Sequence, residues 1–138
     1  MPHSDDQLVR RIPTVDEYLH LRDIAGLSPF TAEAARIGLA GSIFGTVIEH
    51  DGQAIGMGRI IGDGGCFFQV TDIAVDPNHQ GRGLGKMIMS ALMKYVQTAL
   101  PGSAYVSLIA DLPADRLYAQ YGFQDVAPGS VGMAFRRN

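Results

Sequence analysis

Hydrophobic positions along the first third of the chain predict one short strand and two helices. Residues 8–12 could form a first edge strand. Thr14-Val15-Asp16-Glu17 has the form of a capping box with Thr14 as N-cap, so a helix should begin there and stop near Gly26. Ser28-Pro29 predicts a second helix with Pro29 at its first position, ending by Gly41.

The middle of the chain changes to strand-like runs separated by turn residues. Residues 44–49, 54–61 and 66–75 each predict a strand, and turns fall at 50–53 and 62–65. Asp51-Gly52 is a strong hairpin signal between the first two of these strands. The three runs therefore predict an antiparallel meander.

Helical spacing returns after a glycine-rich turn. Apolar residues recur at helical intervals from Leu84 to Val96, and Pro101-Gly102 ends that helix. Residues 105–110 predict a strand, 113–120 a short helix, and 123–126 and 133–136 a closing pair of strands. This order predicts an α+β fold on a mostly antiparallel sheet. We expect a single domain over residues 1–138, with residues 1–7 as a short mobile leader.

Composition narrows the class of protein. The chain has 138 residues, of which 46% are hydrophobic, and a net charge of −3, which disfavours nucleic acid as a partner. No membrane span or signal peptide is visible, and a single cysteine, Cys66, excludes an internal disulfide. A reducing, cytoplasmic compartment fits best. We expect Cys66 to be a small buried residue, and the four scattered histidines predict no metal site.

The turn Gln80-Gly81-Arg82-Gly83-Leu84-Gly85 carries the clearest functional signal. Glycine lets the backbone approach a ligand closely, and N–H groups at a helix start attract anions. Arg82 and Lys86 add positive charge, so the segment is a candidate pyrophosphate cradle. The segment matches neither the Walker loop nor the dinucleotide fingerprint, because it lacks a glycine that each of these motifs requires. The alternative is a flexible loop that merely precedes a helix.

Two motifs resemble those of the GNAT superfamily of N-acetyltransferases. Gln80, Gly83 and Gly85 fill the fixed positions of the Q/R-x-x-G-x-G/A signature, after Asp72-Ile73-Ala74-Val75-Asp76-Pro77. Leu117-Tyr118-Ala119-Gln120-Tyr121-Gly122-Phe123 resembles the family's L-Y-x-x-x-G-F segment. The resemblance implies a GNAT-like fold: a mixed, mostly antiparallel central sheet of six to seven strands flanked by helices on both faces.

The resemblance also implies how acetyl-coenzyme A, the acetyl donor, would bind. The pantetheine arm would pair with the cofactor strand in the gap where the family's fourth and fifth strands splay apart. Backbone N–H groups of the glycine-rich turn would hold the pyrophosphate. Many members carry Asn where this chain has Asp111, which could instead cap the helix at Pro113. The implied cofactor-binding residues are Ile73, Ala74, Val75, Gln80, Gly81, Arg82, Gly83, Leu84, Gly85 and Lys86.

Two residues are candidates for the chemistry. Tyr118 matches the family's general acid, since a phenol is protonated at neutral pH and can donate to the departing thiolate. A purely structural Tyr118 is the alternative, and Tyr121 competes for the role. Asp72 should point opposite to Ile73 and could act as the base for the amine. The competing interpretation of Asp72 is a solvated or ion-paired carboxylate.

The sequence therefore predicts an acyltransferase that passes acetyl directly to an amine in a ternary complex. A non-catalytic acyl-coenzyme A-binding or interaction module is the competing class. The acceptor, whether a small molecule or a protein amine, is not readable from the sequence. Exposed edge strands and the resemblance predict a homodimer, with the C-terminal strands as candidate contacts.

Overall fold

The computed structural model describes residues 5–137 and follows a β-α-α-β-β-β-α-β-α order. The chain divides into two compact units, Met1–Leu108 and Ile109–Asn138, which are described separately below. The first unit contains β1 (Asp6–Val9), α1 (Val15–Ile24), α2 (Ala32–Ala40), β2 (Phe44–His50), β3 (Gln53–Gly62), β4 (Phe67–Val75), a 3-10 turn (Pro77–His79), α3 (Leu84–Ala99) and β5 (Tyr105–Ser107), and the second contains α4 (Asp115–Ala119).

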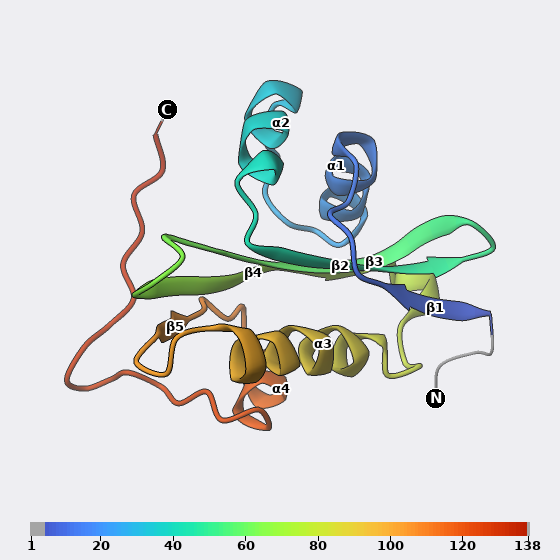
Figure 1. The fold of residues 1–138 in the computed structure, drawn as a ribbon. Helices are drawn as coiled ribbons and strands as arrows, with labels where there is room; N and C mark the ends of the chain where they lie inside the picture. The colour runs from blue at the N-terminus through green and yellow to red at the C-terminus, as the bar shows by residue number, and fades with distance from the viewer. Residues whose placement is uncertain (1–4, 138) are drawn as a thin grey trace. The chain divides into compact units, whose positions relative to one another are not determined.

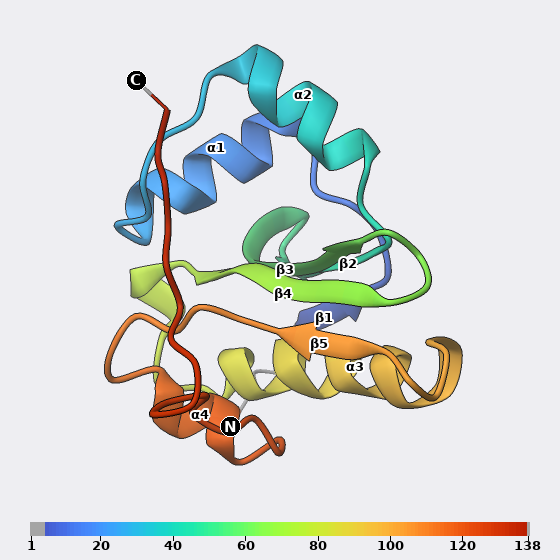
Figure 2. The same ribbon diagram turned by 90° about the vertical axis from the view of Figure 1, so that its left-hand side faces the viewer.

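The first unit is a mixed five-stranded sheet in the order β1-β2-β3-β4-β5, covered by helices on both faces. The pairs from β1 to β4 are antiparallel, and β5 is parallel to β4. Helices α1 and α2 lie on one face and α3 on the other (Figure 1), as the side view in Figure 2 also shows. The predicted α+β class and flanking helices are confirmed.

The sheet has fewer strands than the six to seven expected. Residues 123–126 and 133–136, predicted as closing strands, are not strands in the structure. Val131, Met133 and Phe135 keep the alternating pattern but are exposed, and the pattern alone does not make a strand without a partner. The C-terminal strands that we named as candidate dimer contacts are therefore not formed, and the homodimer stays a prediction.

The N-terminal elements follow local capping chemistry. The capping box at α1 is confirmed: Oγ1 of Thr14 accepts from the Glu17 amide, and Glu17 accepts from the Thr14 amide. Helix α2 begins later than predicted, because Thr31 rather than Ser28 is its N-cap. Ser28 instead accepts from Arg22 through both its carbonyl oxygen and its hydroxyl.

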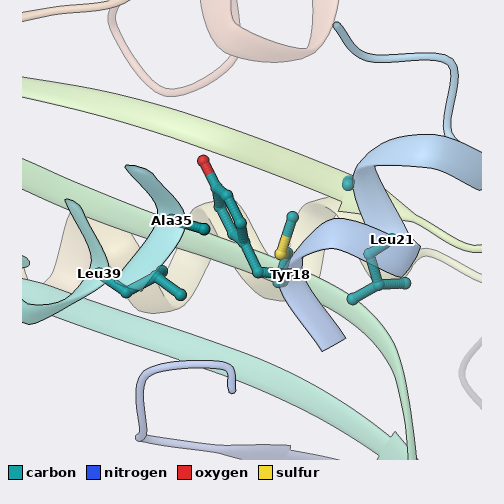
Figure 3. Packing of buried hydrophobic residues seen from close by; sticks show 6 residues of the cluster. Tyr18, Leu21, Ala35 and Leu39 are labelled. Atoms are coloured by element: carbon teal, nitrogen blue, oxygen red, sulfur yellow. The ribbon is translucent and has the colours of Figure 1, made fainter. Parts of the chain in front are cut away.

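A compact apolar cluster joins α1 and α2 to the sheet. Tyr18 and Leu21 of α1 pack with Ala35 and Leu39 of α2 (Figure 3). Met57 of β3 and Ala74 of β4 complete the cluster from the sheet. The ring of Tyr18 belongs to this cluster, while its oxygen points away from Leu21 and Leu39 toward polar partners.

Helix α3 packs very closely on the opposite face. A Cβ at Gly58 would lie 2.6 Å from Cγ2 of Ile88 and 3.1 Å from Cδ1 of Leu92. Gly56 faces Ile88 in the same way, with a Cβ 3.3 Å from Cδ1. Glycine at these two positions of β3 lets α3 approach the sheet closely.

Several predicted boundaries move. Asp6 and Gln7 pair with β2, so the expected leader over residues 1–7 does not include them; residues 1–4 lie outside the described residues. Strand β5 is shorter than the predicted 105–110, and α4 is shorter than the predicted 113–120. Across residues 5–137, no helix combines the length and the apolar character that crossing a bilayer requires.

Candidate active site

The two parallel strands of the sheet separate after a short paired segment. β4 pairs with β5 only through Phe67, Phe68 and Gln69, and β5 ends at Ser107. β4 continues to Val75 and is held on its other side by β3, where Met57 faces Ala74 and Gly56 faces Val75. Alternate residues in the 70–75 stretch therefore direct backbone N–H and C=O groups away from β3, where no strand of residues 5–137 pairs with them.

A bulge interrupts β4 in the stretch that pairs with β3 but not with β5. The register against β3 shifts between Met57 and Arg59, and Asp72 adopts a φ of +60°. A positive φ is uncommon for a residue other than glycine, and Asp tolerates it better than most. The bulge gives β4 a local bend at Asp72.

Asp72 and Ile73 face opposite sides of the sheet, as predicted. Ile73 lies near Gly58 on the α3 face, where a Cβ on Gly58 would lie 3.4 Å from its Cγ1. Asp72 contacts Tyr18 and Arg22 of α1 instead. The side chain of Asp72 is thus turned toward the face that α1 and α2 cover.

Three donors from distant parts of the chain bind the Asp72 carboxylate. Nη1 of Arg22 donates to Oδ1. Nε of Arg59 and the hydroxyl of Tyr18 donate to Oδ2, at 2.6 and 2.9 Å. The carboxylate is only 5% exposed, and the side chains of Arg22 and Arg59 are 9% and 11% exposed.

This network bears on the two interpretations of Asp72. Burial raises the pKa of the Tyr18 phenol, and the neighbouring Asp72 charge raises it further, so the phenol stays protonated and donates. Two buried guanidinium groups and the phenol donate to lone pairs of the Asp72 carboxylate. The contacts are those of the ion-paired alternative, and they leave Asp72 poorly placed to accept a proton from an amine.

The glycine-rich turn has the backbone geometry of an anion site. Gly81 and Gly83 have φ values of +81° and +77°, and a Cβ at either position would meet no atom within 4 Å. Gly83 is the N-cap of α3, a 16-residue helix, and it makes no side-chain cap hydrogen bond. Gln80 precedes Gly81, Lys86 is exposed, and Leu84 is buried beneath the turn. An uncapped helix start beside open space fits a phosphate group.

Arg82 has a different environment from the one its charge predicts. Its Nη2 donates to Oδ1 of Asp6 at 3.1 Å and to Nδ1 of His79 at 2.6 Å. Asp6 has a fully buried carboxylate and also binds Nδ1 of His50 at 2.8 Å. The Arg82 side chain therefore ties the turn to β1.

Sequence reasoning missed Asp6, because residues 1–7 read as a leader and nothing in the local pattern marks it. Together with Asp5 and His50 it forms a group whose ligand atoms lie within 4.8 Å of one another. Arg82 already donates to Asp6, and a guanidinium beside a cation would oppose binding. We assign no metal to this cluster.

The predicted general acid lies in the second unit. Tyr118 is in α4 and is half-buried, and burial raises the pKa of its phenol, with a further contribution from the charge of Asp111. Asp111 does not cap α4, since Ala114 is the N-cap and makes no side-chain cap bond. Tyr121 follows α4, and its amide donates to the Tyr118 carbonyl at 2.9 Å.

Cys66 was expected to be buried, and this prediction is wrong. The thiol is exposed immediately before β4, because Asp63 turns the chain there by accepting from the amides of residues 65, 66 and 67.

The fold agrees with comparisons to known proteins. A family model described as an acetyltransferase (GNAT) domain matches residues 41–125, which is more than half of the chain. The chain therefore belongs to the GNAT family of acetyltransferases.

Individual relatives support this assignment. GCN5-related N-acetyltransferase 2 of Arabidopsis thaliana is 32% identical over 85 residues, covering 62% of this chain and 32% of that protein. Histone acetyltransferase TAP1 of Glycine max is 32% identical over 86 residues, covering 62% and 36%. The chain thus spans about a third of the length of these curated relatives. A crystal structure of a Staphylococcus aureus protein of unknown function, a probable acetyltransferase, is 45% identical with a TM-score of 0.90, covering 96% of this chain and 99% of that one.

Proposed function

We propose that the protein transfers an acetyl group from acetyl-coenzyme A directly to an amine in a ternary complex. The uncapped start of α3, with left-handed Gly81 and Gly83 beside open space, carries this proposal. Residues 80–86 would hold the pyrophosphate by backbone N–H groups. Family membership supports the identity of the donor.

The pantetheine arm would lie along β4 where that strand has left β5. Residues 73–75 would offer it the backbone groups that face away from β3, in the manner of an added strand. The thioester would then lie near the bulge at Asp72, since the arm runs from the α3 start along this strand.

In the transfer, the amine nitrogen attacks the thioester carbonyl carbon and a C–N bond forms. The C–S bond breaks, the thiolate takes a proton from the Tyr118 hydroxyl, the amine proton passes to solvent, and solvent returns a proton to the Tyr118 phenolate. The raised pKa of Tyr118 keeps this phenol protonated before transfer. Asp72, with its three donors, would position Arg22 and Arg59 rather than act as the base.

The direct test is thiol release from acetyl-coenzyme A across a broad panel of amines, paired with a binding titration of acetyl-coenzyme A. Turnover with at least one amine supports the proposal. Tight binding without turnover on any amine, in a folded protein, would indicate a binding module instead.

A further inference from the structure

The network around Asp72 contains more positive than negative charge. Arg22 and Arg59 both pair with Asp72, and neither forms an ion pair with any other carboxylate of residues 5–137. The three side chains are almost completely buried and leave one positive charge without a countercharge. A buried charge is costly unless something of opposite charge pairs with it.

The hydrogen bonds of the two arginines show which guanidinium nitrogen has no partner among the described residues. All three nitrogens of Arg22 donate, to Asp72 and to Ser28. Arg59 uses Nε for Asp72, and its Nη1 donates to the Gly38 carbonyl and the Ser42 hydroxyl, both at 3.1 Å. Nη2 of Arg59 donates to none of the described residues. This nitrogen is not fully buried, so solvent reaches it.

The surroundings of Nη2 are shaped by a glycine and an aromatic ring. Gly38 lies inside α2, where glycine costs about 1 kcal/mol relative to alanine. A Cβ there would lie 3.9 Å from Nη2, so glycine leaves this side of the nitrogen bare. Phe30 is 46% exposed and stacks on the Arg22 guanidinium, 4.6 Å from its ring centroid. An exposed apolar ring therefore belongs to the same network as the open cation.

We infer that Nη2 of Arg59 binds a carboxylate carried by the amine acceptor. The inference rests on the proposed function, which brings the thioester near the Asp72 bulge. One uncompensated positive charge matches a monoanion better than a phosphate dianion. Because Arg59 and Asp72 share a hydrogen bond, the acceptor's anionic end and the reacting end of β4 are held by one rigid network.

Matched acceptors test this inference. The series consists of ω-amino acids of two to six carbons, each compared with its amide, with 3-aminopropylphosphonate as the dianionic probe. The amide keeps the amine and removes the charge. We expect kcat/KM to favour the best carboxylate by about tenfold or more over its amide, since a charge-assisted hydrogen bond is lost. A preference for the phosphonate would overturn the choice of carboxylate.

Arg59→Lys keeps a positive charge near Asp72 but removes the second branch of the guanidinium. We expect the carboxylate preference to fall toward one, with acetyl-coenzyme A affinity unchanged. Arg11→Lys is the matched control, because Arg11 also pairs with carboxylates but lies in a separate cluster with Glu17 and Glu49. Equal use of acid and amide by the wild type, or an undiminished preference in Arg59→Lys, would overturn the inference.

A second variant tests the same inference in case Arg59→Lys folds poorly. Gly38→Ala should stabilise α2 and place a methyl group beside Nη2, raising KM for the carboxylate but not for the amide. Carboxylate binding is also measured directly, by calorimetric titration of the same ω-amino acids. If no amine is acetylated, the proposed function fails, while this titration still decides whether Arg59 binds a carboxylate.

Discussion

Replacing Asp72 by Asn tests the ion-paired interpretation of this residue most directly. The change preserves shape and one acceptor oxygen but removes the charge that two buried guanidinium groups share. Asn also accepts the left-handed conformation at least as well as Asp, so the φ of +60° adds no strain. The effect measured is therefore that of the lost charge together with one lost acceptor oxygen.

The magnitude follows from burial. Removing one partner of a buried ion pair costs about 3–5 kcal/mol, and the remaining amide oxygen places Asp72→Asn near the lower value. For a chain of this size, a loss of about 3 kcal/mol corresponds to a fall in Tm of roughly 10 °C. Urea unfolding should show the same loss as a lower midpoint with an unchanged m-value.

Asp51→Asn is the matched control. Asp51 also has a positive φ, of 50°, but its side chain is 78% exposed in the turn between β2 and β3. We expect a change of less than about 0.5 kcal/mol there. If Asp72→Asn is as stable as the control and instead loses the low-pH limb of the rate profile, the base interpretation is correct and the network argument is refuted.

Four further changes test other parts of the structure. Tyr118→Phe should lower kcat about 10²–10⁴-fold in a steady-state assay, with little change in Tm, because only the proton donor is lost; full kcat would reject the general acid. Gly83→Val should weaken acetyl-coenzyme A binding in calorimetry, since valine opposes a φ of +77° and fills the open space; unchanged affinity would reject the cradle. Gly58→Ala should lower the free energy of unfolding by about 1–3 kcal/mol, because its Cβ would lie 2.6 Å from Ile88; an unchanged urea midpoint would contradict this packing. The Arg11 guanidinium holds the pKa of Glu17 at about 2, below its value in the unfolded chain, so the stability that this ion pair contributes is present above about pH 5 and is lost toward pH 2. Glu17→Gln should flatten that part of an acid-unfolding curve, and an unchanged slope would show that the ion pair does not contribute to stability.

The features that sequence predicted well are those fixed by neighbours in the chain. The capping box at Thr14, the Asp51-Gly52 hairpin and the α3 start at Gly83 all depend on residues within a few positions. The second helix shows where such reasoning fails. Ser28-Pro29 has suitable local chemistry for a helix start. The Ser28 oxygens accept hydrogen bonds from Arg22 instead, and the helix begins only after its N-cap, Thr31.

The candidate site was predicted only in part, for the same reason. Asp72 was identified from its motif, yet its partners Arg22 and Tyr18 lie 50 and 54 positions away in sequence. No periodicity indicates which arginine reaches a given carboxylate, and both arginines read as ordinary charged residues. Asp6 was missed because a buried carboxylate 76 positions from Arg82 has no local signature.

One irregularity connects the two halves of the proposed reaction. The bulge in β4 turns Asp72 toward α1 in the stretch of strand that β5 no longer pairs with. Without the bulge, the alternation of the strand would be unbroken, and Asp72 could not be presented to Arg22 and Arg59 in this way. The strained φ of Asp72 is held in place by three hydrogen bonds, which is the over-determination that such a backbone conformation needs. Changes to this network should therefore alter acceptor preference while leaving the proposed acetyl-coenzyme A binding at the α3 start intact.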